Sequence, residues 1–309
     1  MTAEKQDIYQ TITDQIISAI ESGKATYKMP WHTMSADSFA PMNAASKKFY
    51  RGINVLSLWA AAEKHGYPTG FWATYRQWQE LGAQVRKREK STLVVFWKFR
   101  DIEQEDAPEG EEMEQKTSRA ILARGYSVFN AAQVDGWTPP KSDESTKNER
   151  IEHAESFFSR IGADIRHGGN RAFYSPATDH IQMPEFFAFD DAVSYYSVLS
   201  HESCHFSGAP SRLNRQLTNR FGDEAYAFEE LIAELGAAFL CSSLGLSITP
   251  RPDHAGYVAS WLKALKDDKR AIFTAASRAQ QAVDYLESVS HLRPTLLSRE
   301  DCASVPLGI

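Results

Sequence analysis

Hydrophobic residues recur at helical spacing close to the start of the chain. The stretch "DIYQTITDQIISAIESGK" has isoleucine at positions 8, 12, 16, 17 and 20, with Gly23 as a stop signal, and this predicts an amphipathic helix. Further patterns predict a helix from about Asn54 to Lys64 and a short helix in "TYRQWQELG" that ends at Gly82. "STLVVFWKF" (91–99) alternates and is rich in β-branched and aromatic residues, so it predicts a strand.

An acidic stretch then interrupts the pattern. Residues 101–117 carry many carboxylates without strong apolar periodicity and predict a solvated loop, a hairpin excursion, because "ARGYSVFNAAQV" (123–134) resumes as a strand. Residues 135–148 contain two prolines and many polar residues, which is typical of a linker. We therefore place a domain boundary near residue 145, between domains 1–145 and 146–309.

The second half is mostly helical in its pattern. A helix is predicted over 149–162, followed by strand-like pieces at 163–168 and 171–184, the latter broken by a turn. From residue 190 onward nearly every segment predicts a helix, the last of them over 270–288. The expected fold class is α+β with two domains: an N-terminal α+β domain and a mostly helical C-terminal domain with a small sheet.

Size and composition exclude several classes of protein. The 309 residues are 42% hydrophobic and 24% charged, which is typical of globular proteins. No stretch approaches eighteen apolar residues, and the first residues do not read as a secretory signal. Cys204, Cys241 and Cys302 form no CxxC pair, which indicates reduced thiols and a cytoplasmic protein.

The net charge of −6 conceals an asymmetry. Residues 1–100 carry 14 Lys and Arg against 8 Asp and Glu, whereas the remainder carries 20 against 32. Five of the seven tryptophans also lie in the basic first third. The two parts of the chain are therefore expected to have different partners.

The stretch "VLSHESCHFSG" (198–208) carries a candidate metal site. His201 and His205 are four residues apart, so a helix places both imidazoles on one face within reach of a single ion. Glu202 lies beside that face, where it can take a proton from a metal-bound water. This is the HExxH arrangement of two ligands and a general base; the alternative is a coincidental pair of histidines on a solvated helix.

A third ligand is expected from the later helix "FEELIAELGAAFL" (228–240). Its candidates are Glu229 and Glu230, which the pattern does not distinguish, whereas Glu234 lies one turn further and could orient a ligand histidine. Gly236 and the two alanines after it would allow this helix to approach the motif helix closely. The expected metal is Zn²⁺, with Mn²⁺ or another divalent ion as alternatives.

Two further features could serve such a site. The strand segment 172–184 precedes the motif helix and could pair with an extended substrate backbone, or be a structural hairpin. Tyr257 and His254 could stabilise an oxyanion if they face the metal, although such residues more often serve packing.

Basic and aromatic residues are interleaved in the first third, a combination that binds single-stranded nucleic acid through phosphates and stacked bases. The alternative is that the tryptophans form a core and the lysines are merely solvated. Tyr50 and Trp72 are the stacking candidates. The cationic candidates form two clusters: Lys47, Lys48, Arg51, Arg86, Lys87, Arg88 and Lys90.

Five stretches, in this order, resemble the ArdC antirestriction family of conjugative plasmids: "PWHT", "FYRGINVLSLW", "TYRQWQELGAQVRK", "HESCHFSGAPSRLNR" and "YAFEELIAELGAAFLC". The resemblance covers nearly the whole chain. It implies an N-terminal domain that binds single-stranded DNA, a C-terminal zincin-like metallopeptidase domain similar to Spartan-type proteases, and protection of incoming plasmid DNA from host restriction. Arg88 departs from the family pattern, which commonly has glycine there.

Together these observations predict a bacterial cytoplasmic protein, in a donor or recipient cell, with a gluzincin-type site. His201, His205 and Glu229 or Glu230 would bind zinc, and Glu202 would be the general base acting on an unidentified protein substrate. A rival hypothesis is a protein that coats single-stranded DNA and has a structural or vestigial metal site. A third is a protease for proteins crosslinked to DNA.

Overall fold

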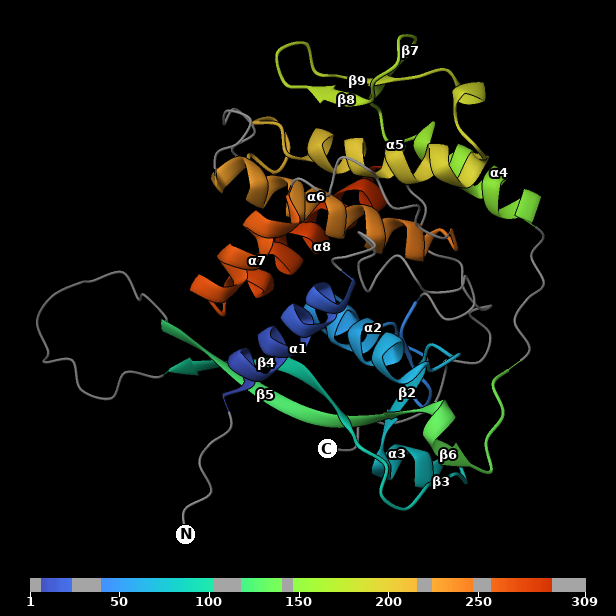
Figure 1. Ribbon diagram of the computed structural model, residues 1–309, viewed down its shortest axis with the longest axis vertical. Coiled ribbons are helices and arrows are strands. Elements are labelled where there is room, and N and C mark those ends of the chain that lie inside the picture. The colour runs from blue at the N-terminus through green and yellow to red at the C-terminus, as the bar shows by residue number, and fades with distance from the viewer. Residues whose placement is uncertain are drawn as a thin grey trace, which may run out of the picture. The chain divides into compact units, whose positions relative to one another are not determined.

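The computed structural model describes residues 7–23, 40–102, 118–140, 147–215, 224–246 and 257–290 (Figure 1). The chain divides into two compact units. Unit 1 contains residues 1–142 with 265–272, and unit 2 contains 143–264 with 273–309. The α+β prediction with two domains is confirmed. The expected boundary near residue 145 lies outside the described residues, and the segment 265–272 belongs to unit 1 rather than to the C-terminal domain.

Unit 1 is built on a four-stranded sheet with the order β1-β2-β5-β4. Strands β1 and β2 are parallel, and the other neighbours are antiparallel. A second, two-stranded sheet pairs β3 with β6. The bounds of its elements are α1 Ile8–Gly23, β1 Met42–Asn43, α2 Ile53–His65, β2 Phe71–Thr74, α3 Tyr75–Glu80, β3 Gln84–Val85, β4 Thr92–Ile102, β5 Ser118–Asn130, the 3-10 turn η2 Ala131–Gln133 and β6 Val134–Asp135.

Local sequence signals set the ends of these helices. In α1, Ile12, Ile16 and Ile20 are buried, so the predicted apolar stripe does face the core. Helix α2 ends at Gly66, whose φ of 65° is a left-handed conformation that glycine adopts readily. Thr74 begins α3 through a capping box.

The β4–β5 hairpin is the longest feature of unit 1. Its register runs from Thr92 opposite Val128 to Ile102 opposite Ser118, which confirms that the two predicted strands pair. Residues 101 and 102 of the predicted acidic loop belong to β4, and residues 103–117 lie outside the described part. Strand β4 is an edge strand, and α2 covers part of this edge because the Asn54 side chain exchanges hydrogen bonds with both N and O of Val95, at 2.7 and 2.8 Å.

Unit 2 places α5 between a small sheet and α6 (Figure 1). The sheet order is β7-β9-β8; β7 is parallel to β9 and β8 is antiparallel to it, so β8 is an edge strand. The bounds are α4 Lys147–Phe158, β7 Asp164–His167, β8 Phe173–Ser175, β9 His180–Met183, the 3-10 turn η3 Phe186–Ala188, α5 Ala192–Ser207, α6 Glu224–Ser243, α7 Val258–Asp267 and α8 Ala271–Ser290. The end of α7 and the first two residues of α8 lie in the segment 265–272 of unit 1.

Small residues allow α5 and α6 to pack closely, as expected. A Cβ added to Gly236 of α6 would lie 2.5 Å from Sγ of Cys204 in α5. Glycine is therefore required for this helix separation, and the separation decides which side chains of α6 reach the histidines of α5.

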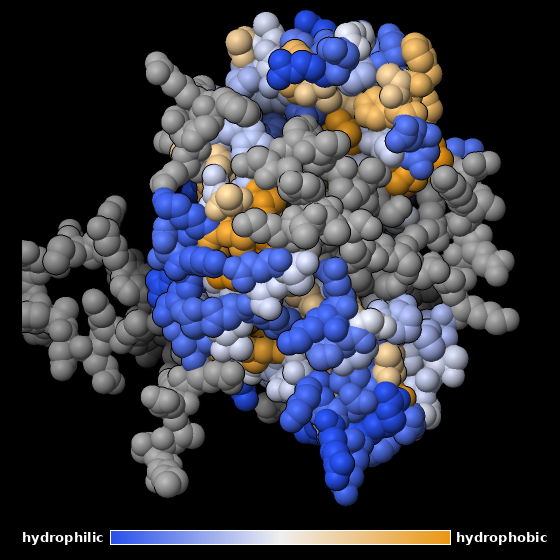
Figure 2. Space-filling view, in the orientation of Figure 1, coloured by the Kyte–Doolittle hydropathy of each residue, from blue (hydrophilic) through white to orange (hydrophobic). Residues whose placement is uncertain are grey.

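None of the helices in the described residues has the length and apolar character needed to cross a membrane. Figure 2 shows mostly hydrophilic residues over the region of α3, β3 and β6.

Candidate metal centre

Helix α5 brings the two histidines of the motif together. Asp191 caps its N-terminus by accepting a 2.8 Å hydrogen bond from Ser194 N, and the helix then runs unbroken through the motif. His201 is 1% exposed, and its Nε2 lies 3.1 Å from Nε2 of His205. Two ring nitrogens thus converge on one point, as ligands of a single ion do.

Glu230 of α6 completes the convergent set. Its carboxylate oxygens lie 3.4 Å from Nε2 of His201 and 3.5 Å from Nε2 of His205. One ligand atom from each of these three residues lies within 4.8 Å of the others. Two atoms bound to one tetrahedral zinc at about 2.1 Å are roughly 3.4 Å apart, which is close to the separations of these donor atoms, so the three side chains suit a divalent ion.

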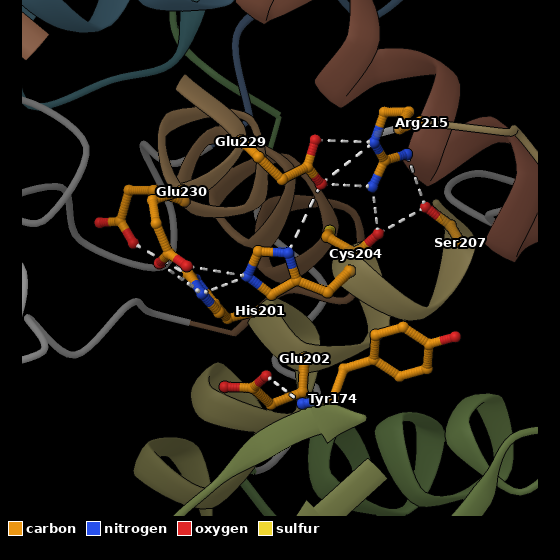
Figure 3. A network of polar contacts seen from close by, with 10 residues as sticks. Tyr174, His201, Glu202, Cys204, Ser207, Arg215, Glu229 and Glu230 are labelled. Carbon is orange, nitrogen blue, oxygen red and sulfur yellow. Dashed lines mark hydrogen bonds and ion pairs between the residues drawn. The ribbon is translucent and has the colours of Figure 1, made fainter. Parts of the chain in front are cut away.

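Glu229, the alternative third ligand, points to a different partner (Figure 3). Its two carboxylate oxygens accept hydrogen bonds from the Arg215 guanidinium at 3.0–3.1 Å, and Oε1 lies 3.4 Å from Nδ1 of His205. Arg215 also donates to Ser207 Oγ and to the carbonyl oxygen of Cys204. The geometry therefore puts Glu229 behind His205, where it can orient the ring.

Glu234 has the corresponding place behind the other histidine. Its Oε2 lies 3.8 Å from Nδ1 of His201, and the residue is 3% exposed. Each imidazole thus has a carboxylate near Nδ1, which favours a proton on Nδ1 and a lone pair on Nε2, the form that binds a metal.

Negative charge dominates this centre. Burial alone would lower the pKa of His205, but the carboxylates of Glu229 and Glu230 raise it to about 10. Burial alone would raise the pKa of Glu230, yet His201 and His205 hold it well below its usual range. Buried carboxylates in this number need a compensating cation, which agrees with the donor geometry.

Glu202, the expected general base, is fixed by the edge strand. The residue is 3% exposed, and its Oε2 accepts a 2.9 Å hydrogen bond from the backbone N of Tyr174 in β8 (Figure 3). Glu202 follows His201 directly in the chain, so its carboxylate is held beside the convergent ligands but outside their set. Strand β8 thus contributes a backbone contact to the site.

A side-chain cluster joins the β8–β9 hairpin to the end of α5. The Tyr174 hydroxyl donates to Oδ1 of Asp179 at 2.7 Å, and Arg212 donates to the same hydroxyl at 3.0 Å and pairs with Asp179. The guanidinium of Arg212 also lies 3.7 Å from the ring centre of Phe206. Because Tyr174 holds Glu202, this cluster positions the base indirectly.

Tyr257, the expected oxyanion residue, belongs to an aromatic group beside the centre. Its ring packs against those of Tyr226 and Trp261, with centroids 6.1 and 6.2 Å away. The hydroxyl of Tyr226 is hydrogen-bonded to Glu230 and to Tyr257, so Tyr257 is linked to the convergent ligands through Tyr226. His254 lies outside the described residues.

Tyr226 and Arg215, like the Tyr174 cluster around Glu202, are not among the residues expected from the sequence. Tyr226 lies four residues before Glu230 on α6, and this helical spacing is a signal that could have identified it. Arg215 has no comparable signal, because nothing in its spacing from the motif indicates which carboxylate it binds.

The expected DNA-binding residues of unit 1 have mixed outcomes. Trp72 is 1% exposed and Tyr50 is 8% exposed, so neither ring can receive a base, and the prediction of stacking at these two positions is wrong. Arg86 is engaged by protein groups: it pairs with Glu89 at 3.0 Å and donates to the carbonyl oxygen of Ala132. The remaining cationic candidates, all of them exposed, are Lys47, Lys48, Arg51, Lys87, Arg88 and Lys90.

Arg88 has an unusual backbone conformation. Its φ of 72° lies in the left-handed region, as does that of Lys47 at 57°. Glycine, which the family resemblance led us to expect at the position of Arg88, would adopt this conformation without strain, whereas a residue with a side chain adopts it at a cost.

Comparison with known proteins places both units in one family. Residues 6–129 match the model of the N-terminal domain of anti-restriction factor ArdC, and residues 152–278 match a zincin-like metallopeptidase model. The metal-free crystal structure of antirestriction ArdC from plasmid R388 is similar to this chain, with a TM-score of 0.73 and a sequence identity of 42%. The match covers 93% of this chain and 98% of the R388 chain. The chain belongs to the ArdC antirestriction family. The Mn(II)-bound structure of the R388 protein matches equally well, at 43% identity and a TM-score of 0.72 over 92% of this chain and 98% of that one.

Two further proteins are similar to this chain. An uncharacterised protein, y4eC, of Sinorhizobium fredii is 56% identical over 91% of this chain and 92% of its own length. The DNA primase TraC of Escherichia coli is 37% identical over 93% of this chain, but the match spans only 27% of the primase. The zincin-like domain implies a divalent metal ion, and the convergent donors of α5 and α6 fit one.

Proposed function

We propose that this ArdC-family protein protects incoming plasmid DNA from restriction, with a unit 1 that binds single-stranded DNA and a unit 2 that is a zinc-dependent peptidase. The observation that carries the peptidase half is the convergence of His201, His205 and Glu230 beside the buried carboxylate of Glu202. The basic first third of the chain and its exposed lysines and arginines support the DNA-binding half.

His201, His205 and Glu230 would hold the ion, and Glu229 and Glu234 would orient the two imidazoles through their Nδ1 atoms. Two imidazoles and one carboxylate are a donor set that suits zinc, and manganese is the alternative. When bound, the ion supplies a more acidic water and a polarised carbonyl oxygen.

Glu202 is the residue that would move the proton. Held at Oε2 by the Tyr174 amide, its carboxylate would take a proton from the attacking water and donate it to the leaving amine. Strand β8 is at the edge of its sheet and could guide an extended protein substrate toward this group. Restriction-associated or other DNA-bound proteins are the substrate class that the antirestriction family suggests.

The test is Glu202→Gln in the full chain. We expect the variant to bind one equivalent of zinc as the wild type does, because Glu202 is outside the convergent set, and to lose cleavage of a casein or peptide-library substrate. Retained cleavage would reject Glu202 as the base.

A second assay separates the peptidase from simple DNA coating. Transfer of an unmodified plasmid into a restricting host should fail with Glu202→Gln if proteolysis protects the plasmid. If Glu202→Gln protects the plasmid as well as the wild type does, the result would instead support a strand-coating protein with a vestigial metal site. Preferential cleavage of protein crosslinked to the same oligonucleotide would support the third hypothesis.

A further inference from the structure

Strand β4 exposes two adjacent aromatic rings. Phe96 is 49% exposed and Trp97 is 38% exposed. Because neighbouring residues of a strand point to opposite faces, these rings lie on different sides of the β4–β5 hairpin. Contiguous exposed apolar surface marks interaction sites, whereas single exposed apolar residues are common and need no partner.

Each ring has an aromatic neighbour. Phe96 packs edge-on against Tyr126 at 5.3 Å, and Arg124 lies over the Tyr126 ring at 5.2 Å. On the other side, Trp97 packs against Tyr9 of α1 at 5.9 Å. The Trp97 pair is therefore covered in part by a helix of its own unit, and the Phe96 side is the more accessible of the two.

The strand register assembles the Phe96 side into one surface. Phe96 is directly opposite Arg124, and Tyr126 is two residues further along β5, so the three side chains share one face. We name them the Phe96 cluster: Phe96, Arg124 and Tyr126. Arg124 is exposed, and no carboxylate of the described residues forms an ion pair with it, so its charge can serve a partner.

We propose that the Phe96 cluster is a base-stacking site for single-stranded DNA, with Phe96 and Tyr126 contacting bases and Arg124 a phosphate. This inference rests on the DNA-binding half of the proposed function and gives it a location that the buried Tyr50 and Trp72 do not provide. A duplex hides the faces of its bases, whereas a single strand offers them to exposed rings without sequence preference. The basic character of the first third complements the phosphates.

The test is fluorescence anisotropy of the full chain with a labelled single-stranded oligothymidylate and a duplex of the same length, across a salt series. Loss of one stacked ring weakens binding by about 5- to 150-fold, and we expect this for Phe96→Ala and Tyr126→Ala. Phe96→Tyr retains a ring and should restore binding to within about twofold. Arg124→Ala should reduce the slope of log K against log salt by about 0.7, the value for one contact to a single strand.

Arg76→Ala is the matched control. It removes a positive charge from the same unit, but Arg76 is paired with Glu80 at 3.0 Å and lies outside the Phe96 cluster, so binding should change by less than about twofold. Circular dichroism checks that each variant is folded.

The outcomes separate the two proposals. If the wild type binds DNA and Phe96→Ala and Tyr126→Ala bind it with the same affinity, the stacking site is overturned and the DNA-binding half of the proposed function is kept. No binding by the wild type would overturn both. A change in the sedimentation of Phe96→Ala, with unchanged DNA affinity, would mean that the surface packs against a second copy and would also overturn the site.

Discussion

Replacing Arg215 by methionine should destabilise unit 2 strongly. The Arg215 side chain is 6% exposed and that of its partner Glu229 is 10% exposed, so this is a buried ion pair, with contacts of 3.0–3.1 Å. Removal of one partner from a buried pair costs about 3–5 kcal/mol, because the remaining charge stays buried and uncompensated. Methionine is similar to arginine in side-chain volume, so the loss of unfolding free energy reflects the missing charge and hydrogen bonds rather than a cavity.

Arg76→Met is the matched control at the surface. Arg76 and Glu80 are 85% and 57% exposed, and such pairs contribute about 0–1 kcal/mol. Adding Glu229→Gln to Arg215→Met removes the orphaned charge and should recover about 1–3 kcal/mol.

The assay is hydrogen exchange by mass spectrometry in a urea series, read on peptides from α5 and α6, because two units need not unfold together. Equal losses for Arg215→Met and Arg76→Met would refute the argument from burial. No recovery on adding Glu229→Gln would show that the destabilisation has a cause other than the unpaired carboxylate.

Three further predictions concern the same unit. Glu229→Gln should weaken metal binding by about 10- to 100-fold and Glu230→Gln by more, measured by competition with a chromophoric chelator; the reverse order would contradict Glu230 as a ligand. Burial and the hydrogen-bonded carboxylate of Asp179 raise the pKa of Tyr174 to about 12, whereas the pKa in the unfolded chain is about 10. The protonated hydroxyl therefore stabilises the folded state fully below pH 10, and this contribution is lost as the pH rises through 12. Unfolding followed across this range should show the loss in the wild type, and an equal loss in Tyr174→Phe would contradict it. Gly236→Ala should cost about 1–3 kcal/mol of unfolding free energy through overlap with the Cys204 thiol, and Cys204→Ala should relieve part of this; additive losses would contradict the overlap.

Features that depend on local spacing could be predicted from the sequence. The buried isoleucines of α1 follow from a period of 3.6, and the meeting of His201 with His205 follows from their separation by one turn. The close packing at Gly236 could also be predicted, because a residue without a side chain on an apolar helix lets a neighbouring helix approach. In each case the relevant atoms belong to one helix or to residues whose size alone decides the contact.

Features that depend on which face of an element is covered could not be predicted in the same way. Trp72 belongs to a stretch in which basic and aromatic residues are interleaved, which favoured exposure, yet it lies in β2, between β1 and β5, and is 1% exposed. Phe96 lies in a strand of the same sheet and is 49% exposed. Both are aromatic strand residues, and their opposite burial is decided by sheet order and by the helices that cover each face.

The choice between Glu229 and Glu230 has the same physical origin. Adjacent residues of a helix point about 100° apart, so only one of the two carboxylates can face the histidines of α5 once the rotation of α6 about its axis is fixed. The close approach at Gly236 constrains that rotation, and Arg215 binds Glu229, the carboxylate that does not converge with both Nε2 atoms. With α6 in this rotation, Glu230 converges with both histidines. A ligand assignment from sequence alone would have needed the position of Arg215, which is set by a turn beyond the end of α5 and not by any helical period.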